Sequence, residues 1–147
     1  MKSLKEQQEE VISDFSLYNE WLDKYEYLIE LGRTMDPYPE EKKTDERLIK
    51  GCQSRVWLDS EVNDGKIFFS ADSDAIITKG IISLLISVYS GREAEEIAGD
   101  DFGFIEEIGL KENLSPTRAN GLFSMIETIK RIAADIVQEE KEEDGGR

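Results

Sequence analysis

Apolar residues recur at steps of three and four in three parts of the chain, which is the period of a helix with one buried face. The first such pattern predicts a helix that begins with Ser13 or Asp14 as its N-cap and ends at Gly32. Its apolar positions are Phe15, Tyr18, Leu22, Tyr25 and Ile29. Residues 4–12, LKEQQEEVI, are predicted to form a short lead-in helix.

The middle of the chain changes to a rough alternation of apolar and polar positions. Residues 55–62, RVWLDSEV, and residues 66–72, KIFFSAD, are separated by NDG. Two short alternating runs joined by an Asp-Gly pair are typical of an antiparallel hairpin. Residues 47–51, RLIKG, are a candidate for a third strand. The preceding segment, TMDPYPEEKKTDER, has two prolines and no apolar period, which indicates an extended surface loop.

A second helix follows the hairpin, with Asp72, Ser73 or Asp74 as its predicted N-cap. The apolar positions of this helix are Ile76, Ile77, Ile81, Leu84, Leu85 and Val88. Further isoleucines extend the apolar surface around the helix, so we expect its neighbours to enclose it almost completely. Gly80 is expected to permit a close approach of another element.

A third helix is predicted to begin with Ser115 as its N-cap and Pro116 at the first helical position. Its apolar positions are Leu122, Ile126, Ile129, Ala133 and Ile136. The order of helices, hairpin and helices predicts an α+β fold, in which a small three-stranded antiparallel sheet packs against helices. Residues 1–138 are predicted to form a single domain, and residues 139–147 an acidic flexible tail.

Length and composition agree with one globular domain. The chain has 147 residues, of which 39% are hydrophobic and 35% charged. Its longest apolar stretch is interrupted by Lys79 and is too short to span a bilayer. The polar N-terminal sequence MKSLKEQQEE lacks the apolar region of a secretion signal, so a cytoplasmic location is expected. The net charge of −15 argues against binding to nucleic acid.

The chain contains no histidine and a single cysteine. Catalytic triads, Cys-His hydrolases and zinc sites with histidine ligands all need an imidazole, so these classes are excluded. One thiolate is too few for an all-cysteine metal or cluster site. No calcium-binding or phosphate-binding loop motif occurs in the sequence, and no metal site is predicted.

The single cysteine, Cys52, stands between Gly51 and Gln53, with Lys50 and Arg55 close by in sequence. A free cysteine is often only a small buried hydrophobic residue, and this interpretation stays open. Neighbouring cations lower the pKa of a thiol and favour the nucleophilic thiolate, so we predict a lowered pKa. A thiolate without a histidine base is suited to attack on another sulfur atom. The product of this attack is a persulfide on the cysteine. Because the chain has no second cysteine that could release the sulfur by forming a disulfide, the persulfide would be retained.

Three motifs in order resemble the SufE family of sulfur acceptors. They are MDPYPEEKKTDERLIKGCQSRVWL at residues 35–58, SADSDAIITKGIISLL at residues 70–85, and LSPTRANGL at residues 114–122. The resemblance implies a SufE/IscU-like fold and a protein that stimulates a cysteine desulfurase of the SufS or CsdA kind. Pyridoxal phosphate would belong to that desulfurase, and this chain would need no cofactor. Scaffolds of the IscU type carry three cysteines, so assembly of clusters on this chain is not expected.

The resemblance also assigns roles to individual residues. Cys52 would receive the sulfur as a persulfide and pass it to an iron-sulfur scaffold such as SufB in the SufBCD complex. Gly51 would allow an unusual backbone angle or a swing of the loop, with an ordinary turn glycine as the alternative, and Gln53 belongs to the same motif. Asp74 is expected to cap a helix and to contact the partner. Arg118 lies where a cation opposes the helix dipole, which suggests contact with the thiol or the desulfurase, although a solvated arginine is an equal alternative.

Two predictions concern the resting state and the rival functions. Because water-borne reductants would destroy a persulfide, we predict that the resting Cys52 side chain is tucked against apolar residues. The main alternative function is a non-carrier allosteric activator, an interaction module that stimulates a desulfurase without taking its sulfur. A carrier that uses the C-terminal diglycine is disfavoured because Arg147 follows that pair.

Overall fold

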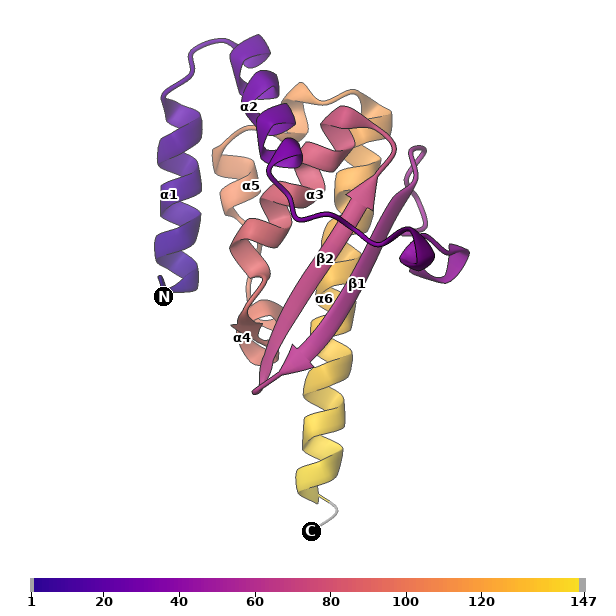
Figure 1. The fold of residues 1–147 in the computed structure, drawn as a ribbon. Coiled ribbons are helices and arrows are strands. Elements are labelled where there is room, and N and C mark those ends of the chain that lie inside the picture. Colours follow the sequence, from indigo (N-terminus) through magenta and orange to yellow (C-terminus); the bar gives the residue numbers. More distant parts are fainter. Residues whose placement is uncertain (1, 146–147) are drawn as a thin grey trace.

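The computed structural model describes residues 2–145, which form an α+β fold with six α-helices and a three-stranded antiparallel sheet (Figure 1). The helices are α1 (Leu4–Ser16), α2 (Trp21–Arg33), α3 (Ile76–Tyr89), α4 (Ala94–Ala98), α5 (Phe104–Glu107) and α6 (Pro116–Gly145), and the strands are β1 (Val56–Asn63), β2 (Lys66–Ser73) and β3 (Arg92–Glu93). Short 3₁₀ turns occur at η1 (Glu40–Lys42), η2 (Asp45–Arg47) and η3 (Lys111–Asn113). The predicted fold class is confirmed.

The hairpin of β1 and β2 has the predicted position and turn. Val56 lies opposite Ser73 at one end, and Asn63 lies opposite Lys66 at the other. The two residues between the strands, Asp64 and Gly65, have φ angles of 54° and 78°. Positive φ at both central positions gives the twist that a tight antiparallel hairpin needs, which explains the Asp-Gly pair.

The third strand is not the one predicted at residues 47–51. The sheet order is β1-β2-β3, and the short strand β3 pairs with the start of β2 through Arg92 and Glu93. Within residues 47–51, Leu48 makes an isolated bridge with Trp57. The chain turns away immediately afterwards, because Gly51 has a φ of 93° that a strand cannot contain.

The N-terminal helix prediction was also wrong in its boundaries. The chain bends between Ser16 and Trp21, so Phe15 lies in α1, Tyr18 in the bend, and Leu22, Tyr25 and Ile29 in α2. The lead-in helix is the full-length α1, and its N-cap is Ser3, whose hydroxyl accepts the N–H of Glu6 at 3.1 Å. The three-four spacing continues through the bend and conceals it, but it does not mark the core face of α2, because Leu22 is 70% exposed while Tyr25 and Leu28 pack in the core.

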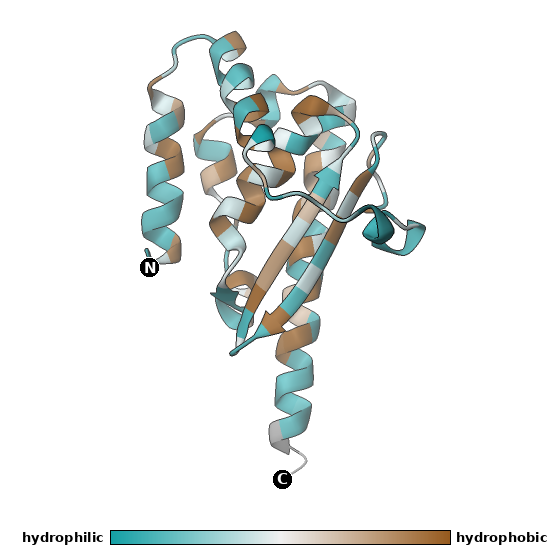
Figure 2. Ribbon diagram, viewed as in Figure 1, coloured by the Kyte–Doolittle hydropathy of each residue, from teal (hydrophilic) through white to brown (hydrophobic). Residues whose placement is uncertain are grey.

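Helix α3 is enclosed by its neighbours, as predicted. The hydrophobic residues of the chain gather on α3 and along the strands, while the end of α6 is hydrophilic (Figure 2). A Cβ added at Gly80 would lie 2.2 Å from the carbonyl oxygen of Leu28, so α2 and α3 are in close contact there. The N-cap residue is Ala75, which provides no side-chain cap, rather than one of the three predicted polar residues.

Helix α6 begins as predicted, with the Ser115 hydroxyl accepting the N–H of Arg118 at 3.3 Å. The helix continues to Gly145, so residues 139–145 are helical where a flexible tail was predicted. Glutamate and lysine are strong helix formers, and residues 122–144 contain no proline or glycine that would interrupt the helix. The last part of α6 projects beyond the strands (Figure 1). Residues 146–147 of the predicted tail lie outside the described range.

The segment between α2 and β1 crosses the strands on the side away from α6 and then turns back towards the start of β1 (Figure 1). It covers Trp57, which is buried, and the Lys43 ammonium lies 5.4 Å from the centre of that ring. Lys43 is also paired with Asp72 of β2 at 3.1 Å. This crossing segment ends at Cys52. Across residues 2–145, none of the helices combines the length and the apolar character needed to cross a membrane.

Candidate functional site

Cys52 lies in the loop before β1 and packs against the first turns of α6. Its side chain is half-buried and in contact with the hydrophobic core. The Sγ atom lies 3.6 Å from the carbonyl oxygen of Gly121, to which the thiol donates a weak hydrogen bond. A Cβ added at Gly121 would lie 3.5 Å from Sγ, at ordinary van der Waals distance, so the thiol lies directly against this glycine. The predicted sheltered position of the thiol is confirmed.

Gly51 adopts a backbone conformation that favours glycine. Its φ angle is 93°, and an added Cβ would lie 2.3 Å from the hydroxyl of Ser124 on α6. Residues with side chains rarely adopt this φ, and the lack of space reinforces the requirement. The predicted unusual backbone angle is therefore present, and it turns the chain so that the next side chain faces α6.

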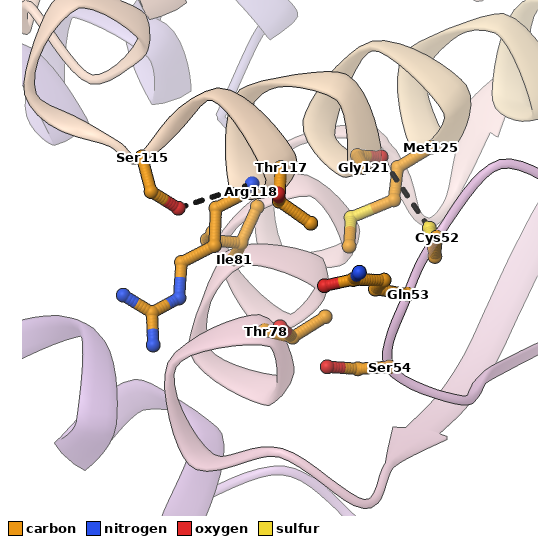
Figure 3. Close-up of a pocket in the computed structure, with 10 residues that line it drawn as sticks. All are labelled: Cys52, Gln53, Ser54, Thr78, Ile81, Ser115, Thr117, Arg118, Gly121 and Met125. Atoms are coloured by element: carbon orange, nitrogen blue, oxygen red, sulfur yellow. Dashed lines mark hydrogen bonds between the residues drawn. The ribbon is translucent and has the colours of Figure 1, made fainter.

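A cavity of about 310 Å³ opens beside the thiol (Figure 3). Its buried floor consists of Thr78, Ile81, Gly121 and Met125. Around its mouth lie Gln53, Ser54, Ser115, Thr117 and Arg118. Two predicted site residues, Gln53 and Arg118, thus meet Cys52 at one cavity, although they lie 65 positions apart on two different elements.

Asp74 does not line this cavity and does not cap α3. Its carboxylate accepts the backbone N–H of Arg55 at 3.0 Å, and its own N–H donates to the carbonyl oxygen of Arg55 at 3.2 Å. The hydroxyl of Ser73 donates to the same carbonyl oxygen at 2.8 Å. These three hydrogen bonds fasten the chain just after Cys52 to the end of β2. The predicted capping role was wrong, and a contact with a partner stays a prediction.

Comparison with known proteins decides the family. The model of the SufE family, described as an Fe-S metabolism associated domain, matches residues 9–133. The chain belongs to the SufE family. An uncharacterized SufE-like protein of Rhizobium etli is 41% identical over 130 residues, which cover 85% of this chain and 88% of that protein. An uncharacterized SufE-like protein of Rhizobium meliloti is 40% identical over 127 residues, or 83% of this chain and 91% of that protein.

A solved structure supports the fold of this SufE-family chain. The solution structure of a hypothetical protein from Thermus thermophilus matches with a TM-score of 0.74 at 19% sequence identity. The match covers 90% of this chain and 96% of that protein. Membership of the family associates the chain with iron-sulfur metabolism.

The electrostatic state of the thiol differs from the prediction. Burial raises the pKa of Cys52 above the ordinary value, because a thiolate at this position would lose much of its hydration. The nearby cations do not offset this effect, since the side chains of Lys50 and Arg55 are exposed and make no hydrogen bond with the thiol within residues 2–145. The resting SufE-family chain therefore holds Cys52 as a neutral thiol.

Several residues of the site were not singled out from the sequence. Gly121 belongs to the third family motif, but only its contact with Cys52 reveals its role. Thr78 and Met125 occupy helical positions that resemble ordinary core positions, and nothing in their spacing distinguishes them. In the described part of the chain, no three acidic or cysteine side chains are grouped to hold a metal ion.

Proposed function

We propose that this SufE-family chain accepts sulfur on Cys52 from the persulfide of a cysteine desulfurase and delivers it to an iron-sulfur scaffold. The observation that carries this proposal is the position of the only cysteine, half-buried at a cavity in a loop that glycine and hydrogen bonds shape. The family's association with iron-sulfur metabolism supports the same function.

The transfer step is a displacement at sulfur. The Cys52 thiolate attacks the outer sulfur of the desulfurase persulfide, a new S–S bond forms, and the desulfurase cysteine leaves as a thiolate. The proton of Cys52 must be lost first, and burial opposes that loss. We infer that the loop opens when the desulfurase docks, so that the thiol ionises outside its half-buried position. Gly51 and the Asp74 attachment mark the two ends of the moving segment.

After transfer the persulfide returns to the cavity beside α6. The apolar side chains of Ile81 and Met125 form part of the floor and suit a neutral or polarisable sulfur atom. A persulfide in this position can be reached only through the mouth of the cavity. Reopening of the same loop on a scaffold would expose the outer sulfur to the next acceptor.

The partners follow from this function. The donor is a desulfurase of the SufS or CsdA kind, which contributes the pyridoxal phosphate, and the acceptor is a scaffold of the SufB or SufBCD kind. Gln53 and Arg118 at the mouth of the cavity, and Asp74 behind the loop, are the residues proposed to contact a partner. These reactions would take place in the cytoplasm.

Intact-mass spectrometry tests the proposal directly. The chain is incubated with L-cysteine and a cysteine desulfurase without reductant, and a gain of about 32 Da, one sulfur atom, is expected on Cys52. Cys52→Ser should gain nothing and should not stimulate desulfurase turnover. Absence of the added mass during active turnover would contradict the carrier role. Full stimulation by Cys52→Ser would favour the allosteric activator instead.

A further inference from the structure

We propose that the cavity beside Cys52 is a binding site for small thiols that carry a carboxylate group, and that such thiols take sulfur directly from the Cys52 persulfide. The transfer to these thiols rests on the proposed carrier function. The binding of small carboxylates beside the thiol does not, since it depends only on the cavity itself.

The cavity is larger than storage of one sulfur atom requires. Its volume is about 310 Å³, whereas a water molecule, similar in size to a sulfur atom, occupies about 30 Å³ in the liquid. Cavities that hold small organic ligands begin at about 300 Å³. After a persulfide has formed, most of the space therefore remains free for a molecule of several heavy atoms.

One polar group in the cavity floor has no hydrogen-bond partner within residues 2–145. Thr78 is only 7% exposed and forms part of that floor (Figure 3). Its hydroxyl makes no hydrogen bond with any other side chain or backbone group in residues 2–145, and because every fully buried polar side-chain atom there has a partner, the hydroxyl oxygen is accessible from the cavity. A hydroxyl that is accessible from a cavity and has no partner in the protein is suited to a polar atom of a ligand.

Within residues 2–145, the only charged side chain that lines the cavity is Arg118. Its guanidinium makes no ion pair or hydrogen bond in this part of the chain, although acidic residues outnumber basic ones by 33 to 18. The first turn of α6 holds no acidic residue, so the positive end of this long helix is not neutralised there. An arginine, a helix N-terminus and an unpaired hydroxyl around one cavity favour a small anion, and a carboxylate fits an arginine by paired hydrogen bonds.

The transfer that this arrangement permits is balanced without any further reactant. The carboxylate is held at the mouth by Arg118, and the thiolate of the same molecule attacks the outer sulfur of the Cys52 persulfide. A new S–S bond forms on the small thiol, the S–S bond to Cys52 breaks, and Cys52 leaves as a thiolate that takes up the proton of the persulfide. The products are a small persulfide and the free thiol of the protein.

Alkylation of the unloaded protein tests the binding site alone. The alkylation rate of Cys52 is measured with iodoacetate and with iodoacetamide, and the first rate is divided by the second. This ratio is then divided by the same ratio for a small model thiol such as N-acetylcysteine amide. Any motion of the loop affects the two reagents alike, so the normalised ratio reports only the recruitment of the carboxylate. We expect the normalised ratio to exceed one by about tenfold at low salt, which corresponds to about 1.4 kcal/mol.

Variants separate this site from general attraction by positive charge. Arg118→Gln should bring the normalised ratio close to one, and Thr78→Val should lower it by about threefold. Arg55→Gln is the matched control, because Arg55 is also an exposed cation near Cys52 but does not line the cavity, and it should leave the ratio unchanged. A ratio near one in the wild-type protein, or an equal loss in Arg55→Gln and Arg118→Gln, would overturn the proposal. Thermal unfolding curves verify that each variant is folded.

A second measurement addresses the sulfur transfer. Protein that carries the added sulfur by mass is desalted and mixed with N-acetylcysteine or with N-acetylcysteine amide, and rates are corrected for the thiolate fraction of each reagent. We expect the carboxylate reagent to show saturation and a rate about tenfold higher, both lost in Arg118→Gln. Equal, linear rates would overturn the transfer. If no sulfur is loaded onto Cys52, the proposed carrier function is wrong. The alkylation ratio of the unloaded protein still tests the carboxylate-binding site, because it does not depend on sulfur loading.

Discussion

Substitution of Gly51 by alanine should open the loop that holds Cys52, and the structure allows the effect to be worked out. The φ angle of 93° costs an alanine about 1 kcal/mol relative to glycine. The new Cβ would also lie 2.3 Å from the hydroxyl of Ser124, which must rotate away from its present rotamer at a further cost of about 1 kcal/mol.

Both costs are relieved if the loop leaves α6. A destabilisation of the closed loop by about 2 kcal/mol raises the population of the open loop by about 30-fold. Alkylation of a buried thiol proceeds through such local opening, so the rate with iodoacetamide should rise by the same factor in Gly51→Ala. The measurement is a pseudo-first-order rate followed by intact mass, at a pH held constant between proteins.

A double substitution separates the two contributions. Ser124→Ala removes the hydroxyl and leaves the Ser124 Cβ, 3.3 Å from the added Cβ, as the nearest atom. In the Ser124→Ala background, Gly51→Ala should therefore raise the rate only about fivefold, the share that comes from the unfavourable φ angle. Ser124→Ala alone is the control and should react like the wild type. A rate for Gly51→Ala within about twofold of the wild type would refute the reasoning about the loop.

Three further predictions concern stability and ionisation. Gly80→Ala places a Cβ 2.2 Å from the carbonyl oxygen of Leu28 and should lower the free energy of unfolding by about 3 kcal/mol in a urea titration. Gly65→Ala, whose added Cβ meets nothing within 4 Å, is its control and should cost about 1 kcal/mol. Burial alone would raise the pKa of Asp72, but a backbone N–H and two lysine ammonium groups outweigh it and lower that pKa. Its stabilisation is therefore complete above pH 3.8, the ordinary pKa, and is lost as the pH falls through the lowered pKa, so Asp72→Asn should flatten the acid part of the stability curve. Burial raises the pKa of Cys52, so the midpoint of its alkylation rate should lie above pH 9.0 in the folded chain and shift down towards that value in urea. The neutral thiol then stabilises the fold below pH 9.0, and this contribution is lost as the pH rises through the raised pKa.

Much of the fold could be predicted because local rules and tertiary packing agree. The Asp-Gly turn, the Ser115-Pro116 helix start and the close approach at Gly80 each follow from one residue's conformational preference, and all three are present. The bend between α1 and α2 could not be predicted, since the helical period runs on through it. Helix α6 continues through residues 139–145, where the acidic composition predicted a flexible tail, because glutamate and lysine have high helix propensity.

The candidate site was predictable only in part, because it is assembled from distant segments. The motif with Cys52 and the motif with Arg118 are both visible in the sequence, yet only the fold shows that they face one cavity. The role of Asp74 as a fastener of the Arg55 backbone depends on the register between the loop and the end of β2. Such a register is a tertiary property, and no spacing rule within either segment contains it.

The ionisation of the thiol is the point at which sequence and structure disagree most, and the disagreement bears on function. Cations that are close in sequence suggested a lowered pKa and a larger fraction of thiolate, but their exposed side chains leave desolvation as the dominant influence on the pKa of Cys52. A carrier that kept a free thiolate in solution would react with any available electrophile. A thiol that is neutral at rest and ionises only when its loop is released reacts where a docked partner holds the loop open. Under the proposed carrier function, the same burial would both protect the persulfide and limit the partners from which the chain could take sulfur.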